Sequence, residues 1–275
     1  MKDDAGAVDS RRGNRWLAIW GAIVVIGAAG IALKTPFGHF LMHIMGKPIP
    51  THQTWMQLLL GSEWGWLAMA AVGTLLFYPR SGLNAAPWLE RLFFRDARIA
   101  DRPKFLKPVL IGALLCTAFF AAFQISGLAA PLTSQMSLNH ISHADQMKLG
   151  MLYPLADIGA ALSEESIYRF GIISTLMGIF AFAGLAGRNA RGETAFWIAN
   201  IAQALWFGFI HVQQGIVTSQ AGGIPLETLI SAPTWSGLVL GYVYRRWGIE
   251  AAIATHMLAD ILVPIFLLGW GYFHH

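Results

Sequence analysis

Long runs of apolar residues, separated by short polar stretches, dominate the chain. These runs lack the strict alternation of β-strands, and most are close to the roughly 20 residues with which a helix crosses a bilayer. We therefore expect an all-α, polytopic transmembrane helical bundle. The seven apolar segments are about Trp16–Leu33, Leu58–Tyr78, Val109–Leu128, Leu149–Leu185, Ala195–Val217, Leu226–Tyr244 and Ile249–Trp270.

The fourth segment, Leu149–Leu185, is much longer than one span requires. It must be tilted, bent or broken into two pieces, and its candidate breaks are Pro154 and the stretch 184–187. The sequence therefore predicts seven or eight transmembrane helices.

The composition agrees with a membrane protein. Hydrophobic residues make up 55% of the chain and charged residues only 12%, whereas a soluble domain carries about 25% charged residues. The net charge of +4 does not indicate a nucleic-acid partner, because the cations lie between the apolar segments, where they set topology. Cys116 is the only cysteine, which excludes an intrachain disulfide and a cysteine-based metal site.

The positive charges predict an orientation. With the N-terminus in the cytoplasm, 15 of the 19 Lys and Arg residues fall on the inside, while Lys34, Lys47 and Lys148 fall outside. We expect a cytoplasmic N-terminus, an external C-terminus and, in a bacterium, a location in the plasma (inner) membrane.

Four regions follow from this topology. They are a cytoplasmic tail (1–15), N-terminal transmembrane helices (16–148), a core of later transmembrane helices (149–270) and a C-terminal tail (271–275). Residues 87–107 alternate aromatic and basic residues, which is typical of an amphipathic helix on the cytoplasmic leaflet, although an ordinary charged loop fits equally well. Residues 34–54, with His39 and His43, are expected to form an outer interfacial loop.

Charged residues stand in the middle of the fourth apolar segment. A charge inside a bilayer is costly and is retained mainly where it is paired or functional. Arg169 follows Glu165 by four residues, so these two can pair on one helix face. Glu164 is left without an obvious partner, and a catalytic or ion-handling role is indicated for it.

Two later apolar segments carry histidines at helical spacing from a second residue. Phe207 and His211 share one helix face, as do His256 and Asp260. Three converging helices could join these groups to Glu164. A carboxylate and an imidazole can then activate water, while a second histidine and a carboxyl group support an oxyanion, which is the chemistry of peptide hydrolysis.

The ordered motifs EExxxR, FxxxH and HxxxD, between about residues 150 and 265, resemble the CPBP family of intramembrane proteases (CAAX-processing Rce1-type, or Abi). The resemblance implies a glutamate-type endopeptidase that cleaves a membrane-anchored protein or peptide, CAAX-type or other. It implies that Glu164 and His211 activate water and that His256 and Asp260 form or support the oxyanion site. Glu165 and Arg169 would hold the first motif in place, and Phe207 would pack beside the site.

Two points stay open at Asp260 and at the cofactor. An ionised aspartate only accepts hydrogen bonds, so Asp260 must either be protonated or orient His256 from behind; we favour the second role. We expect no metal and no other cofactor. The spacing does not decide this, since Glu164, His211 and His256 could ligate zinc with a water in the fourth position.

Two other functions account for the same residues. In a proton-coupled membrane transporter they would form a proton relay, but the paired broken helices of an inverted repeat are not evident. A catalytically inactive scaffold or immunity-type protein could also retain the three motifs. Both predict membrane insertion, so only an activity measurement separates them from a protease.

Overall fold

The computed structural model describes residues 4–44, 62–94, 105–125, 142–185, 190–219 and 226–274. Every regular element within these ranges is helical, as predicted. The α-helices are α1 (Asp4–Ile44), α3 (Glu63–Phe77), α4 (Pro87–Phe94), α5 (Leu106–Ile125), α7 (His143–Glu164), α8 (Ser174–Phe182), α9 (Ala190–Ser219), α10 (Leu226–Trp247) and α11 (Ile249–His274). A 3₁₀ turn η1 (Tyr78–Arg80) and a π-helix η3 (Glu165–Ile173) complete the set.

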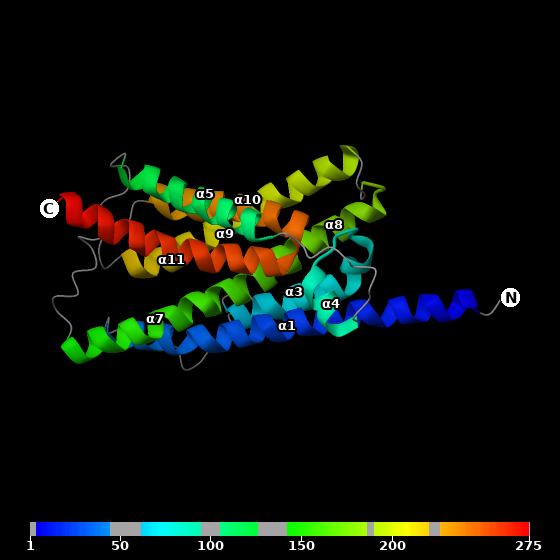
Figure 1. Cartoon of the computed structure of the whole chain (residues 1–275), viewed down its shortest axis with the longest axis horizontal. Helices are drawn as coiled ribbons and strands as arrows, with labels where there is room; N and C mark the ends of the chain where they lie inside the picture. Colours follow the sequence, from blue (N-terminus) through cyan, green and yellow to red (C-terminus); the bar gives the residue numbers. More distant parts are fainter. Residues whose placement is uncertain are drawn as a thin grey trace.

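The long helices run side by side along the long axis of an elongated bundle (Figure 1). Helix α1 packs along α7 on one side of the bundle, while α9 packs on α10 and α5 packs on α11 on the other. The segment formed by α7, η3 and α8 lies between these two sides and contacts both. Residues of the first motif are therefore placed at the centre of the bundle.

The surface of the bundle is apolar, and polar side chains are buried inside it. Glu165, Arg169 and Gln203 are fully buried, whereas large apolar residues on several helices are exposed, among them Val25, Leu76, Leu114, Ile198 and Ile265. This distribution suits a helical protein in lipid. Among the described helices, Arg15–Ile44 and Ile249–Phe266 are long and apolar enough to cross a membrane. A count of seven or eight spans stays a prediction.

The fourth apolar segment forms one unbroken helical path. Pro154 lies inside α7, so the predicted break at this residue is wrong. The helix instead changes to π geometry at Glu165, within the first motif, and returns to α geometry at Ser174. It ends beside Gly184, whose φ of 70° belongs to the left-handed region that glycine adopts without strain.

Helical residues occupy part of one predicted loop and part of the predicted amphipathic segment. Helix α1 continues through Pro36 to Ile44, so the prediction of a loop is wrong for residues 34–44. Contact with α7 stabilises this extension, since the Phe37 and Tyr153 rings pack edge to face at 5.9 Å. Helix α4 occupies the start of the predicted amphipathic segment 87–107, of which residues 95–104 lie outside the described ranges. Oε1 of Glu250 accepts two backbone N–H groups at its N-terminus, each at 2.9 Å.

Two glycines allow α1 and α7 to touch along their backbones. A Cβ atom added to Gly159 would lie only 2.6 Å from the carbonyl oxygen of Gly30 and 2.8 Å from the backbone nitrogen of Lys34. A Cβ atom on Gly30 would lie 2.5 Å from the backbone nitrogen of Ser163. Any larger residue would push the helices apart. This contact places Lys34 opposite the end of α7, where Glu164 stands.

Candidate active site

The first motif spans the junction between α7 and the π-helix. Glu164 is the last residue of α7 and Glu165 is the first of η3. Neighbouring side chains on a helix point in different directions, and here only Glu165 is fully buried in the bundle, whereas Glu164 lines a cavity. A π-helical stretch is rare in proteins and is frequently found at functional sites. The two carboxylates therefore have different surroundings.

Glu165 connects the first motif with the third. Its Oε2 lies 3.2 Å from Nε of Arg169, and both side chains are fully buried, so the predicted pairing of these residues is confirmed. Its Oε1 lies 2.8 Å from Nδ1 of His256 on α11. Because the carboxylate can only accept, Nδ1 of His256 carries the hydrogen of this bond. One buried carboxylate thus holds both an arginine and the second histidine.

The second nitrogen of His256 points toward two other carboxylates. Nε2 lies 3.4 Å from Oδ2 of Asp260 and 4.0 Å from Oε2 of Glu164. From the sequence, Asp260 is the group expected to orient His256 from behind. The structure gives that contact to Glu165 instead, because Glu165 makes the shorter bond, on Nδ1, from inside the bundle. Asp260 contacts the nitrogen on the cavity side.

His211 is fixed by its own helix. Its Nδ1 lies 2.7 Å from the backbone carbonyl oxygen of Phe207, one turn earlier on α9. A carbonyl oxygen only accepts, so Nδ1 donates and Nε2 retains a lone pair that can accept a hydrogen bond from water. The Phe207 ring packs against the imidazole at 4.5 Å, and the Arg169 guanidinium lies over the same ring, also at 4.5 Å. Phe207 therefore packs between Arg169 of the first motif and His211 of the second.

The four residues predicted to be catalytic meet at one cavity of about 350 Å³. Glu164 comes from α7, His211 from α9, and His256 and Asp260 from α11. Small and apolar residues of α5, α10 and α11 form much of the remaining wall, including Ala232, Ala259 and Val263. This size and lining are usual for a site that binds an organic ligand.

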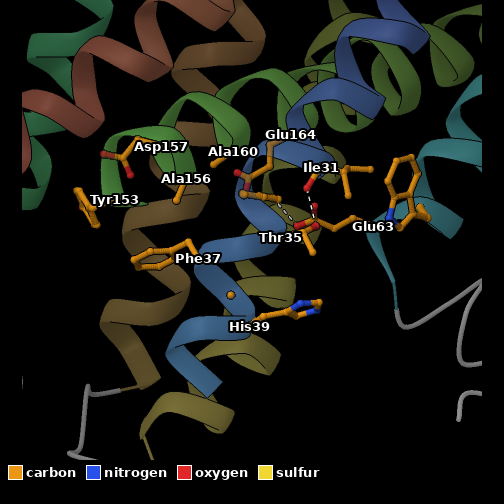
Figure 2. Close-up of a pocket in the computed structure, with 13 residues that line it drawn as sticks. Ile31, Thr35, Phe37, His39, Glu63, Tyr153, Ala156, Asp157, Ala160 and Glu164 are labelled. Atoms are coloured by element: carbon orange, nitrogen blue, oxygen red, sulfur yellow. Dashed lines mark hydrogen bonds and ion pairs between the residues drawn. The ribbon is translucent and has the colours of Figure 1, made fainter. Parts of the chain in front are cut away.

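Sequence reasoning missed the partner of Glu164. Nζ of Lys34 lies 3.3 Å from Oε1 of Glu164 and 2.5 Å from Oε1 of Glu63, so the expectation that Glu164 has no partner is wrong. Figure 2 shows these contacts between α1, α3 and α7. Lys34 ends an apolar run, where a lysine usually serves topology, and it lies 130 residues from Glu164. No local pattern relates two residues so far apart.

No metal centre is evident in the part of the chain that the structure describes. Within it, no three His, Cys, Asp or Glu side chains are grouped so that they could hold a metal ion. The alternative zinc set of Glu164, His211 and His256 gains no support from this arrangement. The metal-free mechanism stays a prediction.

The fold is a helical bundle with an apolar surface, and its cavity is lined by a glutamate, two histidines and an aspartate. Residues 146–262 match the family model described as type II CAAX prenyl endopeptidase Rce1-like. This match confirms the resemblance drawn from the three motifs for residues 146–262, and that family implies protease activity in a membrane. Comparison with curated proteins and with solved structures gives no match. Lys34, which contacts Glu164, and Glu63, which contacts Lys34, lie outside the matched region.

Proposed function

We propose that the protein is a glutamate-type intramembrane endopeptidase that hydrolyses a peptide bond in a membrane-anchored protein or peptide, CAAX-type or other. The observation that carries this proposal is the shared cavity, to which three helices bring Glu164, His211, His256 and Asp260. The match to the Rce1-like family supports the same reaction class.

Water activation falls to Glu164 and His211. A water between them donates one hydrogen bond to the Glu164 carboxylate and the other to Nε2 of His211, whose tautomer is set by the Phe207 carbonyl. Glu164 takes a proton as the water oxygen bonds to the carbonyl carbon of the substrate. Lys34 keeps the carboxylate in place from the opposite side during this step.

The oxyanion falls to His256, supported by Asp260. For Nε2 to donate to the oxyanion, His256 must carry a proton on both nitrogens, and the carboxylates of Glu165 and Asp260 balance the charge of that form. When the tetrahedral intermediate collapses, the carbon–nitrogen bond breaks and the leaving nitrogen takes the proton from Glu164. One substrate fragment leaves as a carboxylic acid and the other as an amine.

The test is cleavage of a library of membrane-anchored peptides by the full chain reconstituted in lipid vesicles. We compare wild type with Glu164→Gln, which keeps the shape of the side chain but cannot act as a base. The matched control is Glu193→Gln, which removes a partly exposed carboxylate that pairs with Arg245 and does not line the cavity. A chelator is added in a parallel series.

We expect cleavage by wild type and by Glu193→Gln, with or without chelator, and loss of at least about 100-fold in Glu164→Gln, the usual size of general-base catalysis. Cleavage that stops with chelator would overturn the metal-free mechanism. A wild type that cleaves no peptide in a broad library would overturn the protease proposal itself.

A further inference from the structure

A second cavity, of about 570 Å³, lies on the other side of Glu164, between α1, α3 and α7 (Figure 2). Its walls include Ile31, Phe37 and Gly38 of α1 and Trp64 of α3. None of these residues belongs to the three motifs, and all lie outside the region that matches the Rce1-like family. The walls that α1 and α3 contribute to this cavity are therefore not part of the Rce1-like match.

One stripe of α7 borders both cavities. We call this second space the α1 cavity, and the space of about 350 Å³ at the candidate active site the catalytic cavity. Four residues line both cavities: Tyr153, Asp157, Ala160 and Glu164. Their spacing of four, three and four residues puts them on a single helix face. Figure 2 shows them in sequence along the helix opposite Phe37 and Thr35. Glu164 thus stands at the border of two spaces that share a wall.

This border position matches the geometry of peptide hydrolysis. The base must stand beside the scissile carbonyl, so the substrate chain has to extend away from Glu164 in two directions. The catalytic cavity has room for the part of the substrate chain on one side of the scissile bond. The α1 cavity is the space available to the other, since it begins at the same four residues of α7.

The lining of the α1 cavity indicates what it accepts. Its large surfaces are apolar or aromatic, supplied by Ile31, Phe37, Trp64 and Tyr153. Its cation, Lys34, is already engaged by Glu63 and Glu164. Carboxylates outnumber cations in the lining, which disfavours an anionic group of the ligand. An apolar or aromatic side chain fits both facts.

We propose that the α1 cavity is a substrate subsite, which binds a large apolar or aromatic side chain of the peptide close to the scissile bond. This inference rests on the proposed function. It assigns to α1, which lies outside the family match, a part in choosing which peptide bond is cut.

Gly38 allows a direct test, because a Cβ atom at this position meets nothing within 4 Å while the residue lines the cavity. Gly38→Phe therefore fills the cavity without disturbing the helix contacts. Gly21→Phe is the matched control, since Gly21 lies on the same helix, also has nothing within 4 Å and borders neither cavity. Phe37→Ala, in the same wall, makes the opposite change and enlarges the cavity.

The measurement is kcat/KM for peptides that wild type cleaves, with Ala, Leu, Phe or Trp placed in turn at each position around the scissile bond. At one position we expect Gly38→Phe to lower the preference for Phe or Trp over Ala by about tenfold or more, as changes of pocket size do. Phe37→Ala is expected to raise it, and Gly21→Phe to leave it unchanged. Size-exclusion chromatography and thermal unfolding verify that each variant is folded.

The outcomes separate this inference from the proposed function. If wild type cleaves no peptide, the proposed function fails. If wild type cleaves but all variants show the same side-chain profile at every position, the subsite is overturned. If Gly38→Phe slows every peptide equally, whatever its side chain, the cavity holds something common to all substrates, such as a lipid chain, and the side-chain assignment is overturned.

Discussion

Oε1 of Glu165 and Nδ1 of His256 lie 2.8 Å apart in the interior, although 91 residues separate them in the chain. The same carboxylate holds Arg169 through its other oxygen. Neither carboxylate nor guanidinium reaches solvent, so the interior tolerates these charges only because they neutralise one another. The arrangement fixes α11 against the π-helix and, with it, the position of His256 beside Glu164.

Removing the charge of Glu165 is expected to damage both stability and activity. Glu165→Gln leaves Arg169 buried without its counter-charge, a change that costs about 3–5 kcal/mol in comparable buried pairs. It also weakens the bond to His256, so turnover should fall. Thermal unfolding in lipid and peptide cleavage measure the two effects.

The pair between Glu193 and Arg245 provides the comparison for Glu165. The Glu193 side chain is 40% exposed, so water can replace part of its ion pair, and Glu193→Gln should change stability by less than about 1 kcal/mol. Equal melting temperatures for Glu165→Gln and wild type would show that the interior does not depend on the Glu165 charge.

Lys34 is expected to act as a positioning residue for Glu164. Lys34→Met leaves Glu63 and Glu164 facing each other without the cation between them, and we expect kcat to fall by about 10- to 100-fold, as losses of orienting partners do, with little change in KM. Lys34→Arg retains the charge and should recover much of the loss. Steady-state kinetics on one cleaved peptide provide both constants.

Lys148→Met serves as the control for Lys34, since it removes an exposed lysine that lies over the Phe40 ring, away from Glu164. Its kinetics should match wild type. An equal loss in Lys34→Met and Lys34→Arg, or a rise in KM alone, would contradict a positioning role based on charge.

The contact between α1 and α7 predicts that Gly159 cannot be enlarged. Gly159→Ala places a methyl group 2.6 Å from the carbonyl oxygen of Gly30, and overpacking of this kind costs about 1–3 kcal/mol. Gly150→Ala is the control on the same helix, where a Cβ atom meets nothing within 4 Å. It should be neutral or stabilise the helix by up to about 1 kcal/mol.

Activity and unfolding are measured together for both glycine variants. Gly159→Ala is expected to lower the melting temperature and also kcat, because any separation of the helices moves Lys34 away from Glu164. If the two variants melt at the same temperature, the close approach of the helices does not exist in the membrane.

The predicted orientation can be tested with single introduced cysteines. Cys116 is the only native cysteine, so replacing it gives a cysteine-free background. Asn84→Cys lies in the exposed turn before α4, which the charge distribution places in the cytoplasm. His143→Cys lies at the exposed start of α7, which it places outside. A membrane-impermeant thiol reagent on intact cells should label the second and not the first; the reverse pattern would overturn the orientation.

The local features of this protein can be predicted from its sequence. Apolar runs without alternation predict helices, because helix formation depends on near neighbours. The spacing of four residues predicts the Glu165–Arg169 pair for the same reason. The three ordered motifs indicate the Rce1-like resemblance of residues 146–262 and select the four residues that line one cavity. The predictions of the end of α1 and of a break at Pro154 were wrong. At both places packing between α1 and α7 outweighs the tendency of proline to end a helix.

How these local features come together in space depends on the packing of the helices. The partner of Glu164 and the true partner of His256 come from helices far away in the chain, and their positions depend on how closely backbones pack. Gly30 and Gly159 permit that closeness, yet neither residue shows in the sequence which helix it will touch. The α1 cavity exists for the same reason. A space between helices is set by their separation, and separation is a property of the packed bundle rather than of any one segment.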